Sequence, residues 1–327
     1  MKVFVTGASG LLGNNIIREL VARNYEVQVL LRTNSNTIAF DDLPVRKIYG
    51  DIRNYDSLRN AIEQCDIIIH SAALTRMNAK KELYEEINVK GTETILRIAS
   101  KLAIKKLIYV STANVFGYGS KSQPGTELTP FAYSRLNSGY IQSKYSAMQL
   151  VIDQCKKNDF EIVQVAPTFL IGPFDTGPSS GKIILLGLKN RFVLCPPGGK
   201  NYIYVKDAAK AICNIIDSGK HGETYLLANE NLTYTEFYKT LETVLNRKLI
   251  KVKIPKHLLL FIGLMGSLFE KILGTPLSLN YVNSKLLCID NYYSGQKAIQ
   301  ELKLSQTPIS IAIKEAVQWF ENNENRN

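Results

Sequence analysis

The 327-residue sequence predicts an α/β protein: a doubly wound parallel sheet with a smaller C-terminal lobe. Apolar runs of strand length alternate with helical patterns through the first half, and a glycine-rich turn joins the first strand to the first helix. The length corresponds to roughly two lobes at about 150 residues each. Strands that alternate with helices form right-handed βαβ units, whose parallel sheets are covered by helices on both faces.

The first βα unit consists of a strand at Val3–Thr6, a turn at Gly7–Gly13 and a helix over Asn14–Ala22. The helix has apolar residues at the spacing of one helical face. Further buried strands are predicted at Glu26–Leu31, Ile67–Ile69, Leu107–Val110 and Glu161–Val165, and a later helix over Ser134–Gln154. This order predicts that the strands lie side by side in one parallel sheet.

The composition is basic, with 40 Lys+Arg against 29 Asp+Glu and a formal net charge of +11. Such a charge admits nucleic acid, an anionic membrane surface or an acidic small molecule as partner. The cations are dispersed along the chain and do not form one block interleaved with aromatic residues, so nucleic-acid binding is not expected. Most of the charge is interpreted as solvated surface.

The cysteine and histidine patterns do not suggest a metal site. The five cysteines include no C-x-x-C pair, and the three histidines include no H-E-x-x-H motif. We therefore expect reduced thiols and no bound metal. Met1-Lys2 leads directly into the first strand without a signal-peptide pattern, and we expect a cytoplasmic protein.

Gly7, Gly10 and Gly13 lie at the corner between the first strand and the first helix. Glycines there let the backbone approach a pyrophosphate, whose charge is met by the amides at the helix N-terminus. A tight turn without a ligand is the alternative, but the surrounding βαβ series favours dinucleotide binding.

At the end of the second strand stands Arg32, with no acid nearby, so it is a candidate clamp for the 2′-phosphate of NADP. A solvated turn residue is the alternative for Arg32.

Tyr140 and Lys144 lie on one face of the predicted helix because they are four residues apart. A nearby fixed cation favours the phenolate, and so moves a phenol toward useful acid–base chemistry. Ser111 and Thr112 follow a predicted parallel strand at the edge where open α/β sheets build their sites. A lone Tyr-x-x-x-Lys is more often a surface pair, and its meaning here depends on the other motifs.

These motifs together resemble those of the extended short-chain dehydrogenases/reductases over nearly the whole chain. The resemblance rests on Thr6–Gly13, Asp51-Ile52, Ser71–Ala73, Asn88–Thr92, Ser111–Gly117 and Tyr140–Lys144, in this order. It implies a Rossmann fold, an NAD(P)-dependent oxidoreductase and a small-molecule substrate. It also favours a homodimer, and NADP is preferred to NAD on account of Arg32.

By this resemblance Thr112, Tyr140 and Lys144 form the catalytic set, with Ser111 as the alternative to Thr112. Tyr133 is excluded because Asn137 stands four residues further on. The cofactor residues implied are Gly7, Ser9, Gly10, Leu11, Leu12, Gly13, Arg32, Asp51, Ile52, Ala72, Ala73, Tyr140, Lys144, Pro167 and Thr168. No residue is assigned to a metal.

Departures from the family pattern reduce the number of reactions that the resemblance implies. Ala113 and Asn114 stand where the sugar-nucleotide dehydratases of the family carry an Asp-Glu pair, so dehydration is not expected. The polar anchors of the epimerases are absent from 166–173. The sequence is most similar to the dihydroflavonol 4-reductase and 3β-hydroxysteroid dehydrogenase-like group, which implies hydride transfer at a hydroxyl or carbonyl carbon of a small, partly apolar substrate. A sugar epimerase and a non-catalytic NADP-binding regulator are the alternatives.

The expected division is a dinucleotide-binding lobe of residues 1–167, joined by about 201–229, and a substrate lobe of residues 168–200 and 230–327. Within the second lobe, Leu258–Phe269 is almost entirely apolar and follows Pro255. Twelve residues are too few to span a bilayer. We expect a buried or lid helix, and the alternative is an apolar wall that receives a lipophilic substrate or rests on a membrane.

Overall fold

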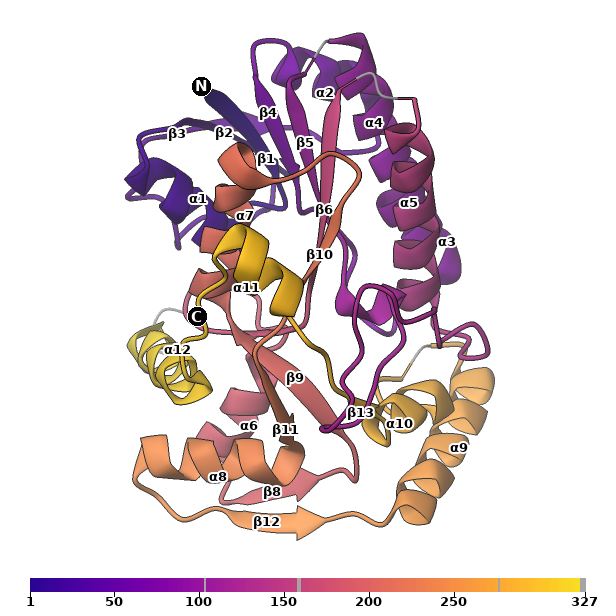
Figure 1. Ribbon diagram of the computed structural model, residues 1–327. Coiled ribbons are helices and arrows are strands. Elements are labelled where there is room, and N and C mark those ends of the chain that lie inside the picture. Colours follow the sequence, from indigo (N-terminus) through magenta and orange to yellow (C-terminus); the bar gives the residue numbers. More distant parts are fainter. Residues whose placement is uncertain (103, 158–159, 276, 324–327) are drawn as a thin grey trace.

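The computed structural model describes residues 1–102, 104–157, 160–275 and 277–323. Its main sheet has seven strands in the order β10-β6-β5-β4-β1-β2-β3, and all neighbours are parallel (Figure 1). The strands are β1 (Lys2–Thr6), β2 (Glu26–Leu31), β3 (Val45–Tyr49), β4 (Ile67–His70), β5 (Lys106–Val110), β6 (Glu161–Pro167) and β10 (Thr224–Leu227). The strand order reverses between β1 and β4, where such sheets open a ligand crevice. The predicted α/β parallel-sheet fold is confirmed.

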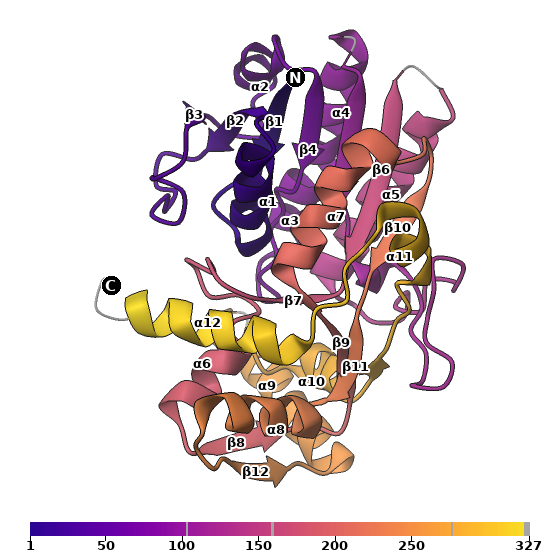
Figure 2. The ribbon, with the colours of Figure 1, turned by 60° about the vertical axis from the view of Figure 1, so that its left-hand side comes forward.

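Helices cover both faces of this sheet (Figures 1 and 2). One face carries α1 (Leu11–Ala22), α7 (Val205–Ser218) and α11 (Gln296–Leu302), and the other carries α2 (Tyr55–Ile62), α4 (Gly91–Lys101) and α5 (Gly139–Cys155). Val3 and Val5 belong to the apolar core under α1 and α7, whereas Phe4 belongs to the core on the opposite face. Successive strand residues point to opposite faces, so a strand covered on both faces is apolar throughout.

The second lobe is smaller, and its strands pair in both parallel and antiparallel directions. Its sheets contain β7 (Phe169–Ile171), β9 (Gly199–Tyr204), β11 (Glu230–Thr233) and β13 (Asp290–Asn291), and the parallel pair β8 (Phe192–Cys195) with β12 (Ile250–Lys253). Its helices are α6 (Lys182–Lys189), α8 (Tyr234–Leu245), α9 (Lys256–Leu273), α10 (Tyr281–Leu287) and α12 (Ile309–Asn323). Between β9 and β11 the chain returns to the main sheet through α7 and β10. The predicted lobe boundaries themselves stay predictions.

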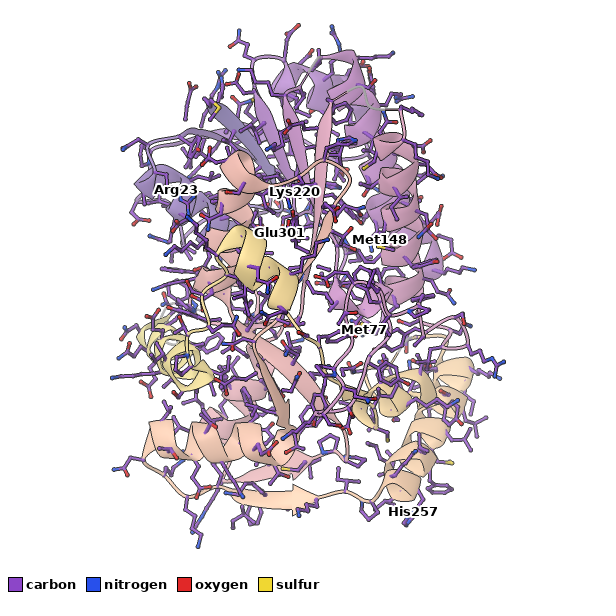
Figure 3. The ribbon with its side chains drawn as sticks, viewed as in Figure 1. Arg23, Met77, Met148, Lys220, His257 and Glu301 are labelled. Atoms are coloured by element: carbon purple, nitrogen blue, oxygen red, sulfur yellow. The ribbon has the colours of Figure 1, made fainter. Side chains whose placement is uncertain are left out.

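Short helical turns complete the first lobe. They are α3 (Lys81–Tyr84), the π-helical turn η1 (Glu85–Lys90) and the 3₁₀ turn η2 (Ala113–Val115). A salt bridge of 2.8 Å between Lys220, after α7, and Glu301 of α11 holds the late helix α11 on this lobe (Figure 3).

Two sequence expectations need correction. The strand β3 was not predicted, because it contains the adjacent charged residues Arg46 and Lys47 and none of its residues is buried at this sheet edge. The helix predicted from Ser134 begins at Gly139, since the Ser138 hydroxyl caps it by accepting a hydrogen bond from the backbone N–H of Ile141.

A buried or lid helix was expected for the apolar segment 258–269, and the buried form is wrong. Helix α9 is longer, Lys256–Leu273, and buries only Leu259 and Gly263. Its remaining large apolar side chains are exposed or half-exposed. Within the described residues no helix is both long and apolar enough to cross a bilayer.

Candidate active site

The glycine corner after β1 is built for a close backbone approach. Gly7 has a φ of +77°, and a Cβ atom there would lie 2.7 Å from the backbone N of Ala72, which follows β4. A Cβ on Gly13 would lie 2.1 Å from the Gly7 carbonyl oxygen. Only glycine fits either position. The turn therefore brings the ends of β1 and β4 together at the point where the strand order reverses.

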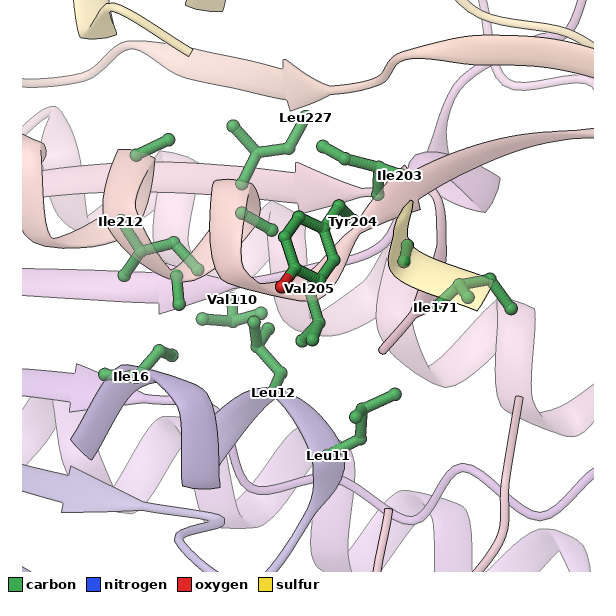
Figure 4. Packing of buried hydrophobic residues seen from close by; sticks show 14 of the residues in the cluster. Leu11, Leu12, Ile16, Val110, Ile171, Ile203, Tyr204, Val205, Ile212 and Leu227 are labelled. Atoms are coloured by element: carbon green, nitrogen blue, oxygen red, sulfur yellow. The ribbon is translucent and has the colours of Figure 1, made fainter. Parts of the chain in front are cut away.

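The first turn of α1 leaves its backbone N–H groups available to an anion. Its N-cap is Gly10, which provides no capping side chain, and the turn contains no acid. Leu11 and Leu12 are buried and direct their side chains into the core beside Val205 and Tyr204 (Figure 4). Free N–H groups and the positive end of the helix dipole together favour a phosphate. The residues present thus fit the pyrophosphate of a dinucleotide.

A loop after β7 covers this corner, and its contacts with the first lobe were not predicted. Asn15 Nδ2 donates to the Pro173 carbonyl at 3.1 Å, and Asn14 Nδ2 donates to the Phe174 carbonyl at 3.3 Å. Thr176 Oγ1 donates to the Ser9 carbonyl at 3.1 Å. These bonds join residues more than 150 positions apart, which local patterns cannot reveal. They hold the second lobe against the glycine turn.

The adenine end of the predicted cofactor site carries two guanidinium groups. Two hydrogen bonds to Arg53, of 2.9 and 2.7 Å, lower the pKa of Asp51, and the charge of Arg32, which is exposed after β2, adds a smaller effect. Ile52 is buried and lies against Gly91. Arg53 also contacts Glu86 at 3.4 Å, so the two guanidinium groups face two carboxylates, and of the two only Arg32 has no ion pair among the described residues. Arg53 was not singled out in the sequence.

A surface pocket of about 700 Å³ opens beside this corner. It is lined by Asp51, Arg53, Asn54, Glu86, Lys90, Glu93, Thr94 and Arg97. None of the predicted catalytic residues lines it, so it lies at the outer edge of the site and not at its chemical centre. Among the described residues no group of His, Cys, Asp and Glu could hold a metal ion.

Thr112 and Tyr140 meet near the carboxyl end of β5. Thr112 follows that strand, and Tyr140 is the second residue of α5. Burial raises the pKa of Tyr140, and the nearby Thr112 hydroxyl lowers it with a smaller effect. A position in the first helical turn also favours a negative charge. The free protein therefore holds Tyr140 as a protonated phenol.

Lys144 is buried on the same helix, one turn further on. Its ammonium donates to the Val110 carbonyl at 2.7 Å and lies 4.7 Å from the centre of the Tyr109 ring. Burial lowers its pKa to about 7. The i,i+4 spacing suggested an ammonium beside the Tyr140 hydroxyl, but the hydrogen bond that the structure gives Lys144 goes to the end of β5.

A buried polar network supports these residues, and sequence patterns did not identify its role. Asn88 Oδ1 accepts from the Leu74 N–H at 2.7 Å, and its Nδ2 donates to Ser143 Oγ at 2.9 Å. Ser143 immediately precedes Lys144. Asn88 therefore ties the loop after Ala73 to the catalytic face of α5.

A second buried chain of polar groups lies behind this network, at the ends of β1 and β4. His70 Nδ1 lies 2.8 Å from Thr6 Oγ1, and His70 Nε2 lies 3.1 Å from Thr92 Oγ1. Thr6 Oγ1 also accepts from the Ala72 N–H at 3.1 Å. Burial, with a smaller effect of Lys144, lowers the pKa of His70 to about 3, so this imidazole is neutral.

Pro167 and Thr168 connect β6 to the second lobe. Thr168 Oγ1 donates to Asn201 Oδ1 at 2.7 Å, and the same Asn201 oxygen accepts from the Asn229 N–H at 3.0 Å. Asn201 lies on β9, so the segment predicted to flank the nicotinamide is fixed to the substrate lobe. Nearby, Lys200 lies 5.0 Å from the Phe169 ring centre, and burial lowers its pKa to about 8.

Tyr133, which the sequence analysis set aside, is fully buried away from this set. Its hydroxyl donates to Asn291 Oδ1, and its ring lies 5.4 Å from that of Tyr118. Burial raises its pKa far above the usual range. Its position is that of a core residue between the two lobes.

Comparisons with known proteins agree with this geometry. The model of the NAD dependent epimerase/dehydratase family matches residues 3–228. A putative dihydroflavonol 4-reductase of Synechocystis is 31% identical over 98% of this chain and 94% of its own length. Sterol demethylase protein B of Methylococcus capsulatus is 28% identical, with 98% of each chain covered.

Solved structures share the fold over the whole chain. The crystal structure of gox2253 superposes with a TM-score of 0.85 at 26% identity and covers 98% of both chains. UDP-glucose 4-epimerase of Thermus thermophilus, solved with NAD, superposes with a TM-score of 0.78 at 19% identity, covering 98% of this chain and 99% of its own. With the glycine corner, these similarities make the chain an NAD(P)-dependent oxidoreductase of the extended short-chain dehydrogenase/reductase type, and it belongs to the NAD dependent epimerase/dehydratase family.

Proposed function

We propose that the protein is an NADP(H)-preferring oxidoreductase that acts on a hydroxyl or carbonyl carbon of a small, partly apolar substrate, in the manner of a dihydroflavonol reductase. The observation that carries this proposal is the buried Lys144 ammonium, which donates to the Val110 carbonyl at 2.7 Å one helical turn from Tyr140, with Thr112 just after the same strand β5. A protonated phenol at that place can give a proton to a carbonyl oxygen.

Each residue of the set has a distinct task in this proposal. NADP, when bound, supplies or accepts the hydride. Tyr140 donates its proton to the substrate oxygen during reduction and accepts it during oxidation. The Thr112 hydroxyl hydrogen-bonds the same oxygen and orients it, while Lys144, anchored on Val110, presents its ammonium to the ribose hydroxyls. Burial raises the pKa of Tyr140, which favours its role as an acid and hence reduction at neutral pH.

The preference for NADP rests on the exposed guanidinium of Arg32 after β2, which no acid engages among the described residues. A 2′-phosphate adds charge to the ribose, and guanidinium groups bind phosphate oxygens strongly through paired hydrogen bonds. Arg32 is the first candidate because the guanidinium of Arg53 is already engaged by Asp51. NAD stays possible as a weaker cofactor.

The partly apolar character of the substrate is supported by the relatives of the chain. The curated relatives are named for a dihydroflavonol and for a sterol, which agrees with this class.

The test is a panel of aldehydes, ketones, dihydroflavonols, sterol ketones and nucleotide-sugars, followed through NADPH absorbance. Oxidation of NADPH by a dihydroflavonol or an apolar ketone is the expected result. Conversion of a nucleotide-sugar while the cofactor stays bound, without net turnover, would replace this proposal with an epimerase. Absence of turnover on every substrate, despite tight NADPH binding, would contradict the proposed substrate class.

A further inference from the structure

Helix α9 turns its apolar side outward. Side chains on its outer face include Leu258, Phe261, Ile262, Leu264, Met265, Leu268, Phe269, Ile272 and Leu273, all of them exposed. Phe261 is 60% exposed and Ile272 is 70% exposed. A surface helix of a water-soluble protein normally shows the reverse pattern, and contiguous apolar patches of this kind mark interaction sites. We call these nine side chains the α9 patch.

The orientation of α9 is fixed by its polar and small residues. Glu270 Oε1 accepts from the Leu277 N–H at 2.6 Å and from Asn280 Nδ2 at 3.0 Å, and Ser267 Oγ accepts from the Tyr281 N–H at 2.9 Å. A Cβ on Gly263 would lie 2.3 Å from Ser284 Oγ, so the small residue lets α10 pack closely. Rotating the helix to bury the α9 patch would break all of these contacts.

Basic residues surround the α9 patch. The segment 248–275 contains five lysines and one acid, Glu270, whose carboxylate is already engaged by α10 and the loop before it. Lys253, Lys256 and Lys271 form no ion pair with an acid in the part of the chain that the structure describes. His257 lies at the start of α9, at the end of the molecule remote from Arg23 (Figure 3). An apolar surface bordered by cations matches the acyl boundary and headgroups of an anionic membrane.

The strands β8 and β12, which precede α9 in the sequence, also carry exposed apolar side chains. Phe192 and Leu194 of β8 pair in register with Ile250 and Val252 of β12, and all four side chains are exposed. Paired residues of a parallel ladder lie on the same face. Since β12 leads directly into α9 through Pro255, these side chains lie at the same end of the molecule (Figure 1).

We propose that the protein docks on an anionic membrane surface through the α9 patch, with the flanking lysines on the lipid headgroups. A second copy of the chain fits less well. A two-fold interface brings the same patch of both copies together, so it would gather Lys253, Lys256 and Lys271 of both copies at one interface where the only acid of the segment, Glu270, is already engaged. The helix lies along the surface and does not cross it.

The test is co-sedimentation of the full chain with phosphatidylcholine vesicles, with and without phosphatidylglycerol. We expect binding to the anionic vesicles that weakens in high salt. Phe261→Ser, Leu268→Ser and Ile272→Ser together should lower the bound fraction at least about tenfold. Lys253→Gln, Lys256→Gln and Lys271→Gln together should reduce binding to anionic vesicles and leave neutral vesicles unaffected.

Matched controls separate docking from general surface effects. Leu128→Ser removes an apolar side chain that is 92% exposed in another loop, and Lys80→Gln, Lys101→Gln and Lys314→Gln together remove the same charge elsewhere. Both should bind like the wild type. Circular dichroism and NADPH binding of each variant should be unchanged, because none of these residues belongs to the catalytic set. These readouts keep a failure of docking distinct from a failure of the proposed activity.

Three outcomes would overturn the proposal. The first is a wild-type chain that does not sediment with anionic vesicles. The second is equal binding to neutral and anionic vesicles, which would remove the role of the lysines. The third is a wild-type dimer that the apolar α9 variant converts to a monomer without any effect on vesicle binding, which would assign the α9 patch to a second copy.

Discussion

The Lys144 ammonium donates a hydrogen bond to the Val110 carbonyl at 2.7 Å, which fixes a buried cation at the carboxyl end of β5. This bond places the charge where the cofactor and substrate are expected, and burial lowers the pKa of the lysine to about 7. An ordinary lysine titrates near 10.4. The buried charge of Lys144 therefore lowers the free energy of unfolding, and the size of this effect depends on pH.

The first prediction concerns stability without cofactor. Between about pH 7 and pH 10 the unfolded chain keeps a proton on Lys144 that the folded chain has lost, so this residue makes the wild type more stable as pH rises. Lys144→Met lacks this dependence. The free energy of unfolding of the variant minus that of the wild type should fall by up to about 1.4 kcal/mol per pH unit over this range. Urea unfolding at several pH values measures it, with exposed Lys101→Met as control, and a constant difference would contradict it.

Cofactor choice provides the second prediction. Arg32→Ala should weaken NADP binding by about 10–100-fold, because a charge-assisted phosphate contact is lost, and should change NAD binding little. Titration calorimetry with both cofactors gives the two affinities. Arg46→Ala, an exposed change on β3, is the matched control. Equal weakening of NADP and NAD by Arg32→Ala would remove the clamp assignment and direct attention to Arg53.

The third prediction concerns the Thr112 hydroxyl. Thr112→Ala should lower kcat by about 100-fold, since one donor to the substrate oxygen is lost. Burial raises the pKa of Tyr140 and the Thr112 hydroxyl lowers it, so removal of that hydroxyl raises the pKa further. Reduction requires the protonated phenol and is lost as pH rises through its pKa, so the alkaline limb of the pH–rate profile should move to higher pH. Thr112→Ser should restore both properties, and an unchanged profile in the alanine variant would contradict this role.

The fourth prediction concerns Asn88 as a positioning residue. Asn88→Ala leaves the Leu74 N–H and its neighbours without buried partners, which should cost about 1–3 kcal/mol of unfolding free energy. Turnover should fall while KM for the cofactor changes less, because Ser143 sets the position of the catalytic face of α5. Asn190→Ala, which removes one exposed bond at the end of α6, is the control. Equal effects of both substitutions would remove Asn88 from the support of the site.

The sequence predicted the parts of this account that depend on local patterns. The strand β5 was found to within one residue, because Leu107–Val110 is buried on both faces and apolar throughout. The edge strand β3 was missed because two of its residues are charged and none is buried. The start of α5 was placed too early because residues 134–136 form a turn and the helix begins only after its cap, Ser138.

Contacts between distant segments could not be predicted from one sequence. The bonds from Asn14 and Asn15 to the loop after β7 depend on how the lobes meet, as does the link between Thr168 and Asn201. Burial of α9 was expected wrongly because hydrophobicity alone does not tell which side of a helix is covered. The close packing of α10 on Gly263 decides it.

The central claim is that Tyr140 is the proton donor of an NADPH-dependent reduction, and Tyr140→Phe tests it most directly. The variant keeps the ring and removes only the phenol hydroxyl, whose pKa burial raises and Thr112 lowers. With a substrate found in the panel, we predict that NADPH oxidation falls by at least about 100-fold while NADPH affinity changes less than about threefold. Turnover equal to that of the wild type, with the same affinity for NADPH, would contradict the account.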